Sequence, residues 1–189
     1  MTKSTELKEK NNTNNAMTNS YKNAFFKIFY NHEKSLYYLM DLGVGYGTFY
    51  KIMEETIIID NTIINIGESY LIFSFKKSNE NDEEEINEND LYLKIYSNEG
   101  EYDPLIIQNN DRVYQIGRSE KCDIYIKDKM LSRIHCELFF TDNNWYIKDG
   151  NEEGVESTNG TWVYANDEKE IKEGMKFKSN SCKFLCKFQ

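Results

Sequence analysis

Three stretches of this chain decide how it is interpreted: Gly117-Arg118, Leu131-Ser132-Arg133-Ile134-His135 and Ser157-Thr158-Asn159-Gly160-Thr161. Each stretch lies where one apolar-alternating segment gives way to the next, which is where loops occur in a strand-rich domain. We expect the three loops to gather at one end of a sheet. They would bring together a fixed cation, hydroxyl groups and an amide, and this set suits a phosphate ester carried on an extended peptide.

The composition favours an all-β fold. Of the 189 residues, 39% are apolar and 14% are aromatic, Tyr and Phe alternate with β-branched residues, and proline occurs once. From Leu91 onwards, about ten short apolar segments follow one another at close spacing, which predicts a two-sheet β-sandwich of about eleven strands. Similar segments between Phe25 and Phe75 predict a partial second sandwich before it.

Charge and polarity predict the domain boundaries. Residues 1–19 are polar and are expected to be a disordered tail, 20–77 a partial module, 78–90 an acidic linker and 91–189 the main domain. The formal net charge is −9, and the linker holds much of it. Neither module carries a basic stripe, so nucleic acid is not an expected partner. No long apolar run is present, so a membrane is not expected either.

The cysteines and the N-terminus predict an intracellular protein, in the cytoplasm or nucleus. Cys122, Cys136, Cys182 and Cys186 have neither paired spacing nor a histidine at zinc spacing, so reduced thiols are expected rather than a metal site or a disulfide framework. The N-terminus lacks the apolar core of a signal peptide. We expect no cofactor.

An internal repeat relates the two modules. Three pairs of segments correspond: Tyr37–Asp41 with Trp145–Asp149, Gly47–Lys51 with Gly160–Tyr164, and Ser69–Phe75 with Ser181–Lys187. The first copy lacks the opening half of the second. It also has Val44-Gly45-Tyr46 where the second has Ser157-Thr158-Asn159, so we expect it not to bind phosphate.

An incomplete sandwich leaves sheet edges and apolar faces without partners. The partial module would therefore need to pack on the second copy, on another chain through self-association, or on sequence missing from this chain. Because the second copy carries the whole phosphate-binding set, we expect residues 91–189 to keep their phosphopeptide affinity when residues 1–77 are deleted.

The second module resembles a forkhead-associated (FHA) domain. The blocks Gly117-Arg118, Leu131-Ser132-Arg133 with His135, and Ser157 to Thr161 occur in the family's order and at workable spacing, and the resemblance covers about residues 91–189. The family is an eleven-stranded β-sandwich that binds phosphothreonine peptides through loops at one end. The resemblance implies phosphate contacts from Arg118, Ser132 and Thr158, a bond from Asn159 to the peptide backbone, a flanking Arg133, and structural roles for Gly117, His135 and Gly160.

Each assignment has a simpler alternative. Arg118 could be a surface arginine in a turn, and Ser132 and Thr158 could bond their own backbone. His135 has no nearby nucleophile in the pattern, so a structural role is favoured over a catalytic one. The whole chain could also be an assembly scaffold of two sandwich modules without phosphate dependence. An enzyme is not expected, because no P-loop, catalytic triad order or metal cluster is present.

Overall fold

The computed structural model describes residues 24–75 and 89–189, and these contain seventeen β-strands and no α-helix. This confirms the predicted all-β class. The tail predicted at 1–19 and most of the linker predicted at 78–90 lie outside the described residues. Within the described ranges, no helix is long and apolar enough to cross a membrane.

The strands follow one another along the chain in two groups. Before the linker lie β1 (Phe26–Asn31), β2 (Leu36–Asp41), β3 (Thr48–Lys51), β4 (Thr56–Ile58), β5 (Thr62–Ile66) and β6 (Ser69–Phe75). After it lie β7 (Leu91–Ser97), β8 (Gly100–Glu101), β9 (Leu105–Ile107), β10 (Tyr114–Gly117), β11 (Ile124–Tyr125), β12 (Cys136–Thr141), β13 (Asn144–Asp149), β14 (Thr161–Tyr164), β15 (Lys169–Glu170), β16 (Lys176–Ser179) and β17 (Cys182–Leu185).

These strands form three sheets, and each sheet mixes strands from the two groups. The orders are β1-β2-β15, β11-β10-β12-β13-β4 and β17-β16-β3-β14-β5-β6-β7-β8, with β9 paired to β7. The two sequence repeats are therefore not two separate bodies in space.

The repeats exchange their last three strands. Ile57 of β4 lies opposite Tyr146 of β13, and Glu170 of β15 lies opposite Tyr38 of β2. Because Tyr38 and Tyr146 are equivalent in the repeat, β4 and β15 occupy equivalent places, each against the other repeat. In the longest sheet the same exchange is seen. The hairpin β5–β6 lies next to β14 of the second repeat, and the hairpin β16–β17 lies next to β3 of the first repeat.

The exchange is centred on the pair β3 and β14, which run antiparallel side by side. The Ile52 amide donates to the Thr161 carbonyl (3.0 Å), and the Ala165 amide donates to the Thr48 carbonyl (2.8 Å). These two bonds are equivalent in the repeat. Just after β3 and just after β14, two equivalent points, the chain therefore leaves the strands of its own repeat and joins those of the other.

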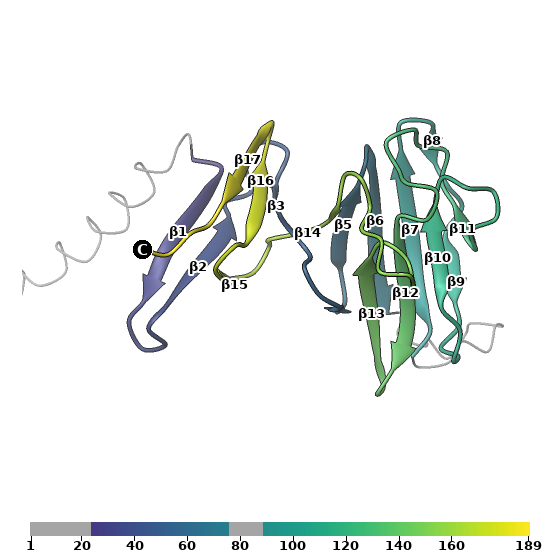
Figure 1. Ribbon diagram of the computed structural model, residues 1–189, viewed down its shortest axis with the longest axis horizontal. Helices are drawn as coiled ribbons and strands as arrows, with labels where there is room; N and C mark the ends of the chain where they lie inside the picture. Colours follow the sequence, from purple (N-terminus) through teal and green to yellow (C-terminus); the bar gives the residue numbers. More distant parts are fainter. Residues whose placement is uncertain (1–23, 76–88) are drawn as a thin grey trace, which may run out of the picture.

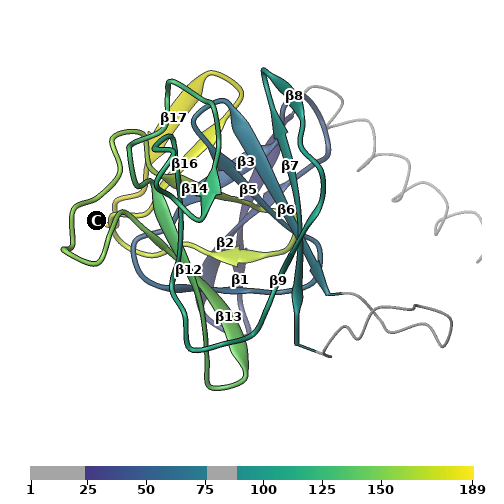
Figure 2. The ribbon, with the colours of Figure 1, turned by 90° about the vertical axis from the view of Figure 1, so that its right-hand side faces the viewer.

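The result is one complete sandwich and one half-sandwich. The complete sandwich contains the eleven strands β4 to β14 (Thr56–Tyr164), and the half-sandwich contains β1–β3 with β15–β17. Figure 1 shows the two bodies side by side, joined where β3 and β14 meet, and in Figure 2 the complete sandwich faces the viewer with the half-sandwich behind it. The predicted domain boundaries, 20–77 and 91–189, follow the sequence repeats and stay a prediction. The sheets instead place residues 56–164 together in the complete sandwich.

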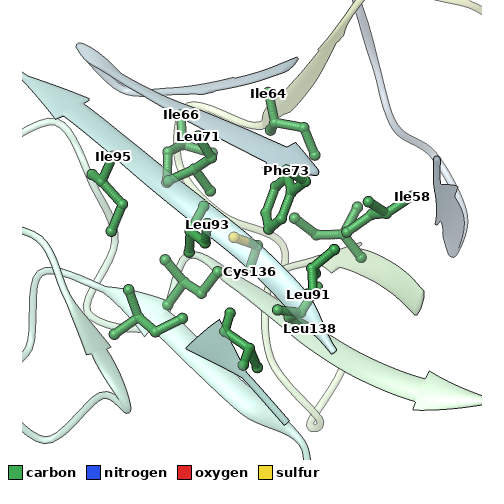
Figure 3. Close-up of a cluster of buried hydrophobic side chains, with 14 of the residues drawn as sticks. Ile58, Ile64, Ile66, Leu71, Phe73, Leu91, Leu93, Ile95, Cys136 and Leu138 are labelled. Carbon is green, nitrogen blue, oxygen red and sulfur yellow. The ribbon is translucent and has the colours of Figure 1, made fainter. Parts of the chain in front are cut away.

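The core of the complete sandwich draws side chains from both repeats. Ile58, Ile64 and Phe73 come from the first repeat and pack with Leu93 and Leu138 from the second, all at most 2% exposed (Figure 3). The core of the half-sandwich is smaller and is also mixed: Leu39, Ala165, Ile171, Met175 and Phe177. Removing either repeat would therefore open both cores.

The hairpins correct the predicted overlay of the repeats by one residue. Ile66 pairs with Ser69 across a two-residue turn, and Ser179 pairs with Cys182 across another. Ile66 and Ser179 are equivalent, since they pair with Thr161 and Thr48 respectively. Cys182 is therefore the equivalent of Ser69, whereas the gapless overlay had placed Ser181 there.

Among the strands that the structure describes, β1 and β17 each have one edge without a neighbouring strand. β1 ends the three-stranded sheet and β17 ends the longest sheet. The equivalent strands of the complete sandwich, β12 and β6, are covered by β10 and β7. The need for a partner at the edges of the partial module remains a prediction.

Candidate functional site

Three loops of the complete sandwich border one hollow of about 570 Å³. The loops follow β10, β11 and β13. Arg118, Ser132, Arg133 and Thr158 all line the hollow, together with Gln115, Ser119, Lys121, Cys122, Ile134, Asn151, Val155 and Glu156. Four of the five residues predicted to bind phosphopeptide are thus brought together.

Backbone contacts hold the first two loops against each other. The Arg118 amide donates to the Ser132 carbonyl (3.1 Å), and the Ser119 amide donates to the Arg133 carbonyl (3.2 Å). The approach leaves no room for a side chain at Gly117, where a Cβ would lie 2.2 Å from the Arg133 carbonyl oxygen. This close contact explains why glycine precedes Arg118.

The two hydroxyls predicted to bind phosphate touch each other. The Thr158 amide donates to Ser132 Oγ (3.0 Å), and Ser132 Oγ in turn donates to Thr158 Oγ1 (3.3 Å). Thr158 is exposed and Ser132 is half-buried. The pair thus presents two adjacent hydroxyl groups at the wall of the hollow.

The Arg118 side chain is exposed, and within residues 24–75 and 89–189 it makes no hydrogen bond or ion pair. Arg133 is also exposed at the rim, and its carbonyl accepts the Cys122 thiol (3.1 Å) as well as the Ser119 amide. Both guanidinium groups therefore remain available to an anion.

Asn159 lies differently from the other four residues. Its Nδ2 donates to the Met130 carbonyl (2.7 Å), and Asn159 is not among the residues that line the hollow. The amide thus ties the loop after β13 to the loop after β11.

His135 is fully buried and links these loops. Its Nδ1 accepts the Ser132 amide (3.2 Å), so its Nε2 carries the proton and donates to the Gly160 carbonyl (3.1 Å). Burial lowers the pKa of His135, which favours the neutral ring that this arrangement needs. Gly160 has φ of +78°, a backbone conformation that glycine adopts without strain.

Asp149 organises the loop after β13, and the sequence analysis gave it no role. Its Oδ1 accepts the hydroxyls of Ser157 and Thr161, both at 2.6 Å, and its Oδ2 accepts the Ser157 amide (3.1 Å). Ser157 Oγ then accepts the Gly160 amide (2.9 Å). The sequence did hold a signal for this role: an aspartate at the end of a predicted strand, followed by serine and threonine residues whose hydroxyls can donate to it.

Asp128 organises the loop after β11 and was also missed. Its Oδ1 accepts the Met130 amide (2.8 Å), two residues on, which is an Asx-type turn. Its Oδ2 accepts bonds from Glu68 and Ser69 in the first repeat. Sequence spacing could have revealed the first contact only.

The hollow is mainly cationic. Arg118, Lys121 and Arg133 line it, and the carboxylate on its wall, Glu156, is paired with Lys51 of β3 at 2.8 Å. This ion pair lowers the pKa of Glu156. The first repeat thus supplies the cation that balances the acid at this wall.

The equivalent end of the first repeat has lost these features. Asp41, the equivalent of Asp149, accepts the Gly43 amide and the Tyr164 hydroxyl at its Oδ2, both at 2.8 Å. Its buried Oδ1 has no partner among the residues that the structure describes. Val44 and Tyr46 are exposed where the second repeat has hydroxyl residues.

Metal binding finds no support in the described part of the chain, where no group of three or more His, Cys, Asp or Glu side chains could hold a metal ion. All four cysteines are free, and Cys122 and Cys136 are buried. The chemistry available at the hollow is hydrogen bonding and charge pairing.

A comparison with protein families finds a match in the second repeat. Residues 114–180 match the family described as FHA domain, a family of protein-interaction modules rather than enzymes. The matched segment runs from β10 to β16 and so passes through the crossover after β14. Comparisons with curated proteins and with solved structures gave no match.

Proposed function

We propose that this chain, which contains an FHA domain, binds phosphothreonine peptides and so mediates phosphorylation-dependent protein interactions. One observation carries the proposal. The exposed guanidinium of Arg118 lines the same hollow as the touching hydroxyls of Ser132 and Thr158.

The three groups suit a phosphate dianion. A guanidinium forks onto two oxygens, and hydroxyls donate to the others. The charge-assisted bonds would contribute roughly 1.5–3 kcal/mol and each hydroxyl bond about 1 kcal/mol. These bonds add up to about 5 kcal/mol at most, whereas a micromolar Kd corresponds to about 8 kcal/mol, so contacts along the peptide must also contribute if the affinity is to reach the micromolar range.

The neighbouring residues would serve the peptide rather than the phosphate. Arg133 at the rim suits an acidic or carbonyl group beside the phosphothreonine. Asn159 uses one Nδ2 hydrogen on the Met130 carbonyl, which leaves its amide oxygen to accept a peptide backbone amide and its second Nδ2 hydrogen to donate to a peptide carbonyl.

The proposed mechanism is recognition without a reaction. No bond of the ligand changes, and the interaction is switched by the kinase and phosphatase that add and remove the phosphate. A ligand of this kind places the protein where protein kinases act, in the cytoplasm or nucleus. Four free cysteines suit such a reducing compartment.

An array of phosphothreonine peptides with random flanking residues tests the proposal on the full chain. Each sequence should be present in phosphothreonine, phosphoserine and unmodified form. We expect binding only to phosphorylated members, because the unmodified hydroxyl offers no charge to Arg118. Equal binding of modified and unmodified peptides would favour the scaffold without phosphate dependence.

A further inference from the structure

We propose that the β5–β6 hairpin of the first repeat is a working part of the phosphopeptide site, because it holds Asp128 and through Asp128 positions the loop that carries Ser132. The first repeat would thus keep a binding role although its own phosphate residues are lost. The proposal deepens the proposed function and rests on it.

Two hydrogen bonds fix Asp128 to the hairpin. The Glu68 amide and the Ser69 hydroxyl both donate to Asp128 Oδ2, each at 2.8 Å. Ser69 is fully buried and Asp128 is 8% exposed. Bonds to a buried carboxylate are among the stronger hydrogen bonds of a protein.

The same carboxylate shapes the loop. Its Oδ1 accepts the Met130 amide (2.8 Å), and the Asp128 carbonyl accepts the Leu131 amide (3.1 Å). These bonds fix the backbone immediately before Ser132. The Met130 carbonyl also accepts Asn159, so the loop that carries Thr158 depends on the same turn.

The hairpin turn is also in direct contact with this loop. A Cβ at Gly67 would lie 2.8 Å from Asp128 Oδ2 and 3.0 Å from the Met130 Cβ. Gly67 has φ of +55°, which suits glycine. Beneath the turn, Leu131 is 3% exposed and belongs to the core of the complete sandwich.

The strand exchange determines which of the two equivalent hairpins, β5–β6 or β16–β17, binds Asp128. In an unexchanged fold, β16–β17 would lie beside β14 and Cys182 would replace Ser69 at Asp128. In the observed fold Cys182 lies in the half-sandwich, where it pairs with Ser179. Ser69 and Cys182 are therefore a matched pair: equivalent in the repeat, but only one of them touches the site.

The test compares Ser69→Ala with Cys182→Ala in the full chain, by calorimetric titration with one phosphothreonine peptide selected on the array. We expect Ser69→Ala to weaken binding by about threefold to thirtyfold, since one bond to a charged group is lost. Cys182→Ala should bind as the unaltered chain does. The reverse pattern, or equal affinity in all three proteins, would overturn the proposal.

Amide hydrogen exchange separates positioning from general destabilisation and does not depend on a ligand. In Ser69→Ala the amides of Met130 and Leu131 should exchange faster, while those of β7 and β13 keep their rates. Uniformly faster exchange would show a merely structural role and overturn the proposal.

Asp128→Asn provides a second variant if Ser69→Ala folds poorly. Asparagine keeps the shape of the side chain but removes its charge, so the bonds from Glu68 and Ser69 weaken. The same local pattern of exchange and the same loss of affinity are expected, and unchanged affinity would contradict the proposal. A full chain that binds no phosphopeptide, even with normal exchange at Met130, would overturn the proposed function and this inference with it.

Discussion

Tyr50 of β3 lies directly opposite Val163 of β14, and an approximate twofold axis relates the two repeats at this pair. The flanking pairs repeat each other: Phe49 opposite Tyr164, and Lys51 opposite Trp162. Exchange of identical elements around such an axis is known from swapped dimers, in which two chains trade strands. In this protein the strands are exchanged between two repeats of one chain.

Engineered disulfides can test the exchange. Ile57 and Tyr146 are directly opposed in antiparallel strands, where Cα atoms lie about 4.5–5.5 Å apart, within reach of a disulfide. In a chain that also carries Cys182→Ser and Cys186→Ser, Ile57→Cys with Tyr146→Cys should form a bridge on mild oxidation. Mass spectrometry of the digested protein identifies the linked peptides.

The matched control for this bridge is Glu170→Cys with Tyr146→Cys. Glu170 is the equivalent of Ile57 and would face Tyr146 if each repeat kept its own strands. We expect no bridge in this variant, because Glu170 lies opposite Tyr38. A bridge here, and none between positions 57 and 146, would show an unexchanged fold.

The hydroxyls of Ser132 and Thr158 should contribute to affinity with little effect on folding. Thr158→Val removes one exposed donor, and we expect phosphopeptide affinity to fall by about threefold to tenfold. Ser132→Ala also removes the acceptor of the Thr158 amide, so its effect should be at least as large. Thr141→Val, at the far end of β12, is the control. Affinities within about twofold of the unaltered protein in both site variants would argue against hydroxyl contacts.

Acid should destabilise the protein through His135. Burial lowers its folded-state pKa, so the folded state binds fewer protons than the unfolded state. The stability that the neutral ring contributes is complete above the ordinary histidine pKa of about 6.5 and is lost as pH falls from there towards the lowered pKa. Protonated Nδ1 could no longer accept the Ser132 amide.

Urea unfolding at pH 7.5 and at pH 5.5 measures this loss. His32→Gln is the control, since His32 is exposed on the half-sandwich, and it should keep the pH dependence. His135→Asn should be less stable at both pH values, and its stability should change less between them. An identical pH dependence in His135→Asn would assign the effect to other groups.

Lys178 should lower stability at neutral pH. Burial lowers its pKa from 10.5 to about 8, although its Nζ donates to Asn65 and lies 4.7 Å from the centroid of the Trp162 ring. Its folded state therefore disfavours the proton, and stability is lost as pH falls from 10.5 to about 8. Lys178→Met should raise the melting temperature at pH 7 by about 2–4 °C, the change expected for roughly 1 kcal/mol.

Lys183→Met is the matched control for this prediction. Lys183 is exposed on β17 and lies 5.8 Å from the same ring. Its charge contributes to the lowered pKa of Lys178, so its replacement should raise the melting temperature, but by less than Lys178→Met does. A fall in melting temperature in Lys178→Met would mean that the contacts with Asn65 and Trp162 outweigh the cost of burying the charge.

Local features of the fold and the site were predictable from the sequence. Alternation of apolar residues indicated the strands, because each strand has one face in a core. The residue types of Arg118, Ser132 and Thr158 indicated an anion site, and their loops do meet at one hollow. Asn159 was placed in the right loop, but its bond to Met130 could not be read from spacing.

The exchange of strands was not predictable from the pattern. β4 and β15 have equivalent sequence positions, so either can complete either sheet, and alternation of side chains is the same in both arrangements. The choice depends on how residues 52–55 and 165–168 cross beside β3 and β14. For the same reason the pairing of Ser69 with Asp128, fifty-nine positions apart, left no local signal.

Calorimetric titration of the full chain with a phosphothreonine peptide and its unmodified twin, repeated on Arg118→Ala, tests the central claim most directly. Arg112→Ala is the control, because Arg112 is paired with Asp123 and does not line the hollow. We predict that binding requires the phosphate, falls at least about tenfold, or 1.4 kcal/mol, in Arg118→Ala, and stays unchanged in Arg112→Ala. Equal affinity for both peptides, or equal loss in both arginine variants, would contradict a phosphate site at Arg118.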